Sequence, residues 1–124
     1  GPLALQKIIE AHLSEKSLTD VERSCVFTSL SSDMLRSKAA HRAMYERHMN
    51  RIYDLFAEAF CKLFPKDSKE QAYFKAINLY SGLVGTLTMA RTMKDASQAK
   101  LALECGKTFL IASFVAKPAR SEAK

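Results

Sequence analysis

The chain has 124 residues, a formal net charge of +6, 48% hydrophobic residues and 26% charged residues. This length suits one globular domain that buries its own core without disulfide bonds or a structural metal, and it excludes two typical domains. No apolar run approaches the roughly 20 residues of a membrane-spanning helix. Strand signals are almost absent, since the sequence has no Asn-Gly or Asp-Gly turn and no alternating β-branched run, so an all-α fold is predicted.

The predicted domain spans residues 4–116. Residues 1–3 are interpreted as a protease-cleavage remnant or a truncation point, and the polar residues 117–124 as a disordered tail. Apolar residues at helical spacing predict a first helix over about residues 4–12. A polar connection that can include a helical turn follows over residues 14–23.

Four further helices complete the predicted plan. A short helix is expected over residues 24–36, and a long one over 39–64 that Pro65 ends. The last two helices are expected over residues 67–94 and 96–116, both unusually apolar. Capping-box spacing assigns their N-termini to two pairs, Asp67 with Glu70 and Asp95 with Gln98.

Glycines interrupt the last two predicted helices, although glycine in a helix interior costs roughly 1 kcal/mol relative to alanine. Small residues allow two helix axes to approach more closely than the usual 8–10 Å. Two arrangements would use them: close packing inside one chain, or a twofold dimer in which both hairpins form a four-helix bundle. The predicted dimer interface contains Gly82, Gly85, Ala99, Ala102 and Gly106.

Two stretches resemble motifs of a known family. Residues 24–37, SCVFTSLSSDMLRS, resemble the "GCPLAALAAE" type of motif in the C-terminal domains of TetR-family transcriptional regulators. Residues 83–95, LVGTLTMARTMKD, resemble the "LVGALLLARAVDD" type that precedes their last helix. The order and spacing of the helices are also similar over residues 4–116, whereas Ser24 stands where the first motif usually has glycine.

The TetR resemblance implies a five-helix effector-binding and dimerisation domain of a bacterial transcriptional regulator. Dimerisation would use the last two helices, and a small apolar effector would bind among the middle ones. The helix-turn-helix domain that reads DNA in this family is absent from the 124 residues. The alternative is a structural or protein-interaction helical bundle that binds no ligand.

Large side chains with apolar bodies are the candidates for the effector pocket, because such sites combine apolar walls with a few polar tips. Tyrosine and histidine can orient a ligand by hydrogen bonds, and methionine adapts to its shape. Ordinary core packing is the alternative for each of them. The candidates are Phe27, Met34, Tyr45, His48, Met49, Tyr53, Phe56, Tyr73 and Tyr80.

Cysteine usage points to a reduced, cytoplasmic environment, since the three cysteines are far apart, form no CxxC pair and follow no secretory signal. Cys25 follows Ser24 at the start of a predicted helix, where thiol pKa values fall. It is therefore either a reactive thiol or a small buried hydrophobe. No metal site is expected, because the histidines and cysteines lack zinc-ligand spacing.

No catalytic motif is present: the sequence has no nucleophile elbow, phosphate loop or dinucleotide fingerprint. We therefore expect neither an enzyme nor a cofactor. A basic stretch at the start of the long helix is predicted to be a solvated face rather than a DNA-binding surface. It contains Arg36, Lys38, His41, Arg42, Arg47 and Arg51.

Overall fold

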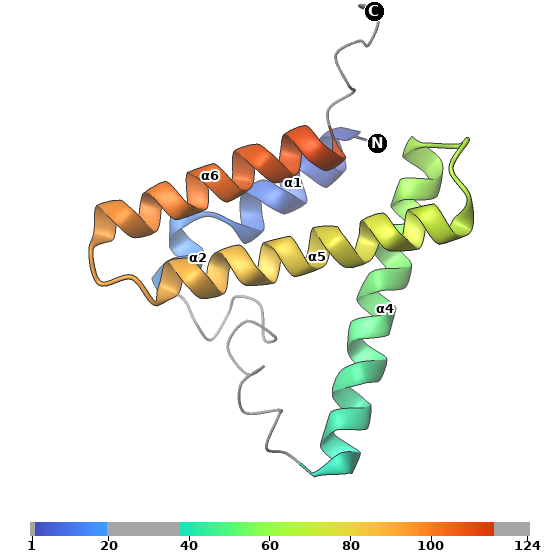
Figure 1. The fold of residues 1–124 in the computed structure, drawn as a ribbon, viewed down its shortest axis with the longest axis horizontal. Helices are drawn as coiled ribbons and strands as arrows, with labels where there is room; N and C mark the ends of the chain where they lie inside the picture. The colour runs from blue at the N-terminus through green and yellow to red at the C-terminus, as the bar shows by residue number, and fades with distance from the viewer. Residues whose placement is uncertain (1, 20–37, 116–124) are drawn as a thin grey trace, which may run out of the picture.

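The computed structural model describes residues 2–19 and 38–115. Within these ranges the chain is helical and has no strand, which confirms the all-α prediction. The short helix predicted over residues 24–36, with Cys25, Phe27 and Met34, lies outside the described residues. The helices are α1 (Pro2–His12), α2 (Glu15–Thr19), α4 (Ala39–Leu63), α5 (Lys69–Arg91) and α6 (Ala96–Phe114) (Figure 1).

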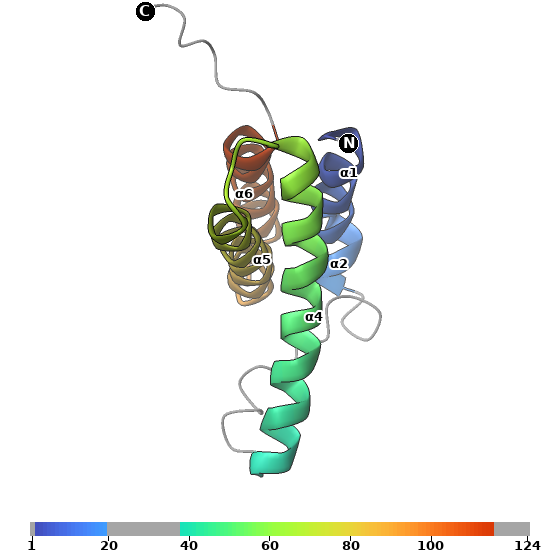
Figure 2. The ribbon, with the colours of Figure 1, turned by 90° about the vertical axis from the view of Figure 1, so that its right-hand side faces the viewer.

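The helices form two layers. Helices α5 and α6 make an antiparallel hairpin, and α1 lies against one side of it (Figures 1 and 2). Helix α4 crosses the N-terminal half of α5 on that same side, and its own N-terminal half extends beyond the hairpin. The opposite side of the hairpin, which faces the viewer in Figure 1, is covered by no described helix.

The core lies between these two layers. Apolar residues three and four positions apart place one face of each helix inward, as expected for amphipathic helices that cover a common core. Each fully buried leucine contributes roughly 2 kcal/mol of apolar transfer free energy. The largest fully buried side chains are Ile9, Leu13, Phe60, Leu79, Leu83, Leu87 and Leu103.

Capping corrects one predicted boundary. Helix α5 begins after Ser68, whose hydroxyl accepts from the Gln71 backbone N–H at 3.1 Å, while the Ser68 N–H donates to the Gln71 side chain at 2.7 Å. The capping box predicted for Asp67 and Glu70 is therefore wrong by one residue. Asp67 instead forms an ion pair with the ammonium group of Lys75. At α6 the predicted Asp95 cap is confirmed, because its carboxylate accepts from the Ser97 backbone N–H.

Close packing inside the chain accounts for two of the three helical glycines. A methyl group added at Gly82 would meet the Leu110 side chain at 2.8 Å, and one added at Gly106 would meet Cγ2 of Thr86 at 2.4 Å. Both glycines therefore let α5 and α6 approach each other. Gly85 is different, since nothing lies within 4 Å of the place its methyl group would take.

Candidate functional site

Four aromatic side chains meet where α4 crosses α5. The Tyr53 ring contacts the rings of Tyr73 and Tyr80 edge-on, with centroids 5.9 Å and 6.2 Å apart, and the Phe56 ring lies 6.0 Å from that of Tyr80. Tyr80 is buried. Burial, followed by the nearby Tyr73, raises the pKa of Tyr53. Such edge-on pairs stabilise the crossing by about 1 kcal/mol each beyond their buried area.

The predicted pocket residues divide into three groups. Tyr45, Met49, Tyr53 and Phe56 are partly buried and pack against the core, and the rings of Tyr53 and Phe56 contact that of the buried Tyr80. His48 is exposed on α4. Phe27 and Met34 lie outside the described residues. The structure therefore brings Tyr53, Phe56 and Tyr80 together at one helix crossing, without deciding between pocket and core.

A polar cluster lies at the other end of the same side of α5. Spacings of four, four and three residues place Tyr80, Val84, Thr88 and Arg91 along one side of the helix. The Arg91 side chain donates from Nε and Nη2 to the Ser17 carbonyl oxygen, at 3.1 Å and 2.7 Å, and so holds α2 against the end of α5.

His12 at the end of α1 belongs to this cluster. Burial lowers its pKa from 6.5 to about 4, and the positive charge of Arg91 acts in the same direction. The His12 Nε2 and Thr88 Oγ1 atoms are buried, and neither has a hydrogen-bond partner. The sequence analysis missed His12, Thr88 and Arg91. A lone histidine ending a helix carries no signal of its own, and the burial of a threonine depends on packing.

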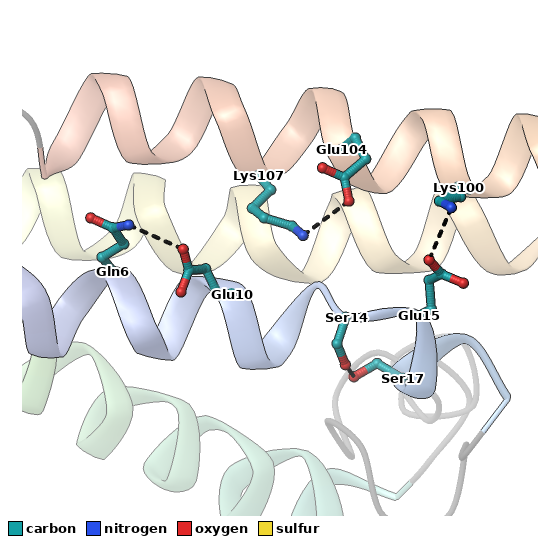
Figure 3. Close-up of polar contacts among 8 residues, drawn as sticks. All are labelled: Gln6, Glu10, Ser14, Glu15, Ser17, Lys100, Glu104 and Lys107. Carbon is teal, nitrogen blue, oxygen red and sulfur yellow. Dashed lines mark hydrogen bonds and ion pairs between the residues drawn. The ribbon is translucent and has the colours of Figure 1, made fainter.

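The charged residues of α6 gather on the side that faces α1 and α2. Lys100 pairs with Glu15 of α2 at 3.4 Å, and Lys107 pairs with Glu104 at 3.0 Å (Figure 3). These exposed pairs contribute little to stability. Glu104 also lines a hollow with Cys105 and Phe109, so it marks the border between this charged side and the mainly apolar opposite side of α6.

The exposed side of the hairpin that lies away from α1 is called the outer hairpin face. Its helical positions point away from α1 in both helices, as the spacing from the buried residues requires. Several of its apolar side chains are largely exposed: Phe74 by 69%, Met89 by 61%, Leu101 by 57% and Phe109 by 67%. The face consists of Phe74, Asn78, Ser81, Gly85, Met89, Leu101, Cys105, Phe109 and Ala112.

Two shallow hollows lie beside the exposed phenylalanines of this face. One, of about 480 Å³, is next to Phe74 at the start of α5 and is also lined by Lys69 and Glu70. The other, of about 510 Å³, is next to Phe109 on α6 and is also lined by Glu104. A third, of about 230 Å³, lies between α1 and α4 and is lined by Ala4 and Leu55 among others. None of these three hollows is lined by Tyr45, Met49 or Tyr80.

The described residues contain no cluster of side chains suited to bind a metal ion. In residues 2–19 and 38–115, no three His, Cys, Asp or Glu side chains come together as a metal site would need. Cys61 and Cys105 are exposed free thiols. The described part of the chain also has no helix that is long and apolar enough to cross a membrane.

The positions of the basic residues at the start of α4 agree with the solvated face predicted for them. Lys38, His41, Arg42, Arg47 and Arg51 are all exposed.

The TetR resemblance rests on the two sequence motifs and the helix order alone. No family model, curated protein or solved structure matches the chain.

Proposed function

We propose that this chain is the effector-binding and dimerisation module of a bacterial TetR-type transcriptional regulator that acts in the cytoplasm. DNA would be read by a helix-turn-helix domain outside these 124 residues. The motif resemblance supports the family, and the outer hairpin face is the observation that carries the proposal. A large and mainly apolar exposed face is a liability for a chain that stays alone in water.

A second copy of the chain suits this face better than a charged partner. The centre of a protein interface is depleted of charge and enriched in aromatic residues and methionine. The centre of the outer hairpin face shares these properties, with Phe74, Met89 and Phe109 exposed. Glu70 and Glu104 lie at its edge, beside the two hollows.

The size of the face also suits a dimer. Helix α5 has 23 residues, which at about 1.5 Å per residue gives a length of about 35 Å. Two helices, each roughly 10 Å wide, give an area on the order of 700 Å². Stable interfaces bury about 800 Å² per partner. Each helix also offers a phenylalanine beside a hollow, so a twofold axis can seat Phe109 of one copy beside Phe74 of the other.

Gly85→Arg is expected to convert the dimer to a monomer. Gly85 lies in the middle of the outer hairpin face with nothing within 4 Å, so the arginine fits the isolated chain but places a charge in the interface. Burial of an unpaired charge costs several kcal/mol, which corresponds to a loss of affinity of a hundredfold or more. Sedimentation equilibrium at micromolar concentration measures the change.

Gly85→Ala is the matched control, and it should remain dimeric. Circular dichroism of both variants should keep the helical signal of the wild type. A wild-type chain that sediments as a monomer at these concentrations would contradict the dimer and, with it, the proposed dimerisation module.

The effector is proposed to bind beside the aromatic group where α4 crosses α5. Tyr45, Met49 and Tyr80 would supply the apolar wall and the orienting hydroxyl groups. An effector would shift α4 against the hairpin and so change the distance between the two DNA-reading domains of the dimer. Ligands move such an equilibrium only by their different affinity for the two states, typically by about 1–3 kcal/mol.

Met49→Ala is expected to abolish the stabilisation that an effector gives the wild-type chain. In a thermal-shift screen of hydrophobic metabolites, a true effector at 100 times its Kd stabilises the wild type by about 2.7 kcal/mol. Tyr45→Ala should show the same loss as Met49→Ala. Met44→Ala is the control, because Met44 is exposed by 56% on the same helix. Hits that stabilise all the variants equally would place the site elsewhere.

A protein-interaction bundle without a ligand is the second candidate function. The aromatic rings at the crossing are in mutual contact, which favours packing over a pocket. A dimer that no compound in the screen stabilises would support this second function.

A further inference from the structure

Polar contacts of three kinds hold α1 and α2 against the hairpin. The Arg91 side chain of α5 donates twice to the Ser17 carbonyl oxygen of α2. Lys100 of α6 pairs with Glu15 of α2, but this pair is exposed and stabilises the contact little (Figure 3). The third contact is the end of α1, where a histidine is enclosed beside Arg91.

That histidine, His12, is enclosed in a way that suits its neutral form. Its Nε2 atom is buried and has no hydrogen-bond partner. An imidazolium ion donates from both ring nitrogens, so a charged His12 would bury an N–H group without an acceptor. It would also place a second positive charge near that of Arg91. The docked position of α1 therefore disfavours the protonated side chain.

We propose that protonation of His12 releases α1 and α2 from the hairpin, while α4, α5 and α6 stay packed together. After release the imidazole lies in water, where its positive charge is solvated. This inference goes beyond the proposed function, because it requires neither an effector nor DNA. It describes a response of the chain itself to acid.

The charged groups around His12 favour this release. On the helices packed around it they are Glu10 of α1, Glu15 and Lys16 of α2, Arg91 of α5 and Lys100 of α6. Glu15 pairs with Lys100, and Glu10 accepts from the Gln6 side chain. Among the described residues, Arg91 is the charge that acts on His12, and it acts in the same direction as burial.

The remaining helices keep their own contacts when α1 and α2 leave. Helix α4 packs on α5 through the rings of Tyr53, Phe56 and Tyr80. Helices α5 and α6 approach each other closely at Gly82 and Gly106. Neither set of contacts includes a residue of α1 or α2. A local release therefore exposes less surface than complete unfolding does.

The size of the effect follows from the two pKa values of His12. Its pKa is about 4 when α1 is docked and 6.5 when the imidazole is in water, so the released form binds the proton more tightly. Acid therefore favours release. The equilibrium constant for release should rise about twentyfold between pH 7 and pH 5.

Hydrogen exchange of the 124-residue chain, followed by NMR at pH 7 and pH 5, tests the release. After correction for intrinsic exchange rates, the protection of the α1 amides should fall about twentyfold. At pH 5 these amides should also be at least tenfold less protected than those in the middle of α5. Their exchange should depend less on urea, because release exposes only part of the buried surface.

Two variants separate the proton from the strength of docking. His12→Gln should give α1 the same protection at both pH values, whereas His41→Gln, at an exposed position, should follow the wild type. Leu13→Ala removes a fully buried side chain next to His12, so α1 should lose protection at both pH values and keep the twentyfold step.

Two results would overturn the proposal. If the α1 and α5 amides of the wild type exchange together at pH 5, with the same urea dependence, acid unfolds the whole chain and releases no part of it separately. If the twentyfold step persists in His12→Gln, another group takes up the proton. A step that is present in the wild type and Leu13→Ala and absent from His12→Gln would support the release.

Discussion

Replacing Gly106 with alanine is expected to lower the free energy of unfolding by about 2 kcal/mol, and replacing it with leucine by about 3 kcal/mol or more. The new Cβ would lie 2.4 Å from Cγ2, 2.8 Å from Oγ1 and 3.1 Å from Cβ of Thr86. Rotation of the threonine can move Cγ2 and Oγ1 but not Cβ, so it relieves the overlap only in part. Helices α5 and α6 would have to separate along the middle of the core.

The matched control is the same substitution at the exposed glycine of α5. Gly85→Ala should raise the free energy of unfolding by up to about 1 kcal/mol, because alanine is the better helix former and the site is open. Thr86→Ala should rescue much of the loss in Gly106→Ala. Urea denaturation of the wild type and these variants measures the differences, and equal stability of Gly106→Ala and Gly85→Ala would refute the assigned packing.

Acidification should destabilise the chain through His12. Its pKa is about 4 when folded and 6.5 when unfolded, so the unfolded chain binds more protons between these values. The stability that the neutral imidazole contributes is fully present above pH 6.5 and is lost as the pH falls through 4. The difference of about 2.5 units corresponds to about 3 kcal/mol at most.

His12→Gln should remove this part of the pH dependence. The glutamine keeps a neutral polar side chain that does not titrate, so the stabilities of variant and wild type should converge as the pH falls from 6.5 to 4. His41→Gln is the control, because His41 is exposed, and it should follow the wild type. Urea denaturation at half-unit steps of pH gives the comparison. Parallel curves for wild type and His12→Gln would contradict a buried neutral His12.

Local rules predicted the helices more accurately than they predicted the site. Proline at position 65 ends α4 at Leu63, and the Asp95 side chain begins α6, as the sequence indicated. At α5 two neighbouring pairs have the same capping-box spacing, and only the structure selects Ser68 with Gln71. Spacing alone cannot choose between adjacent candidates that satisfy the same rule.

The roles of the glycines and of the polar cluster depend on contacts between distant segments. Helical periodicity groups Gly82 with Gly85, yet one packs against Leu110 and the other is open. The helix boundaries were predictable, but the precise rotation of α5 against α6 was not. Burial of His12 depends in the same way on α5, which lies more than 50 positions later in the sequence.

The bond from Arg91 to the Ser17 carbonyl joins residues 74 positions apart. Helices α4, α5 and α6 follow one another closely in the chain. In contrast, the contacts of α1 and α2 with the end of α5 join residues far apart in the sequence, so that forming them closes a long loop of chain. Closing such a loop costs conformational entropy, and that cost is recovered only through the contacts of α1 and α2. The α5–α6 hairpin should therefore form early during folding. Helices α1 and α2 should dock late, and they should be the first to detach in partial unfolding, with His12 exposed to water when they do.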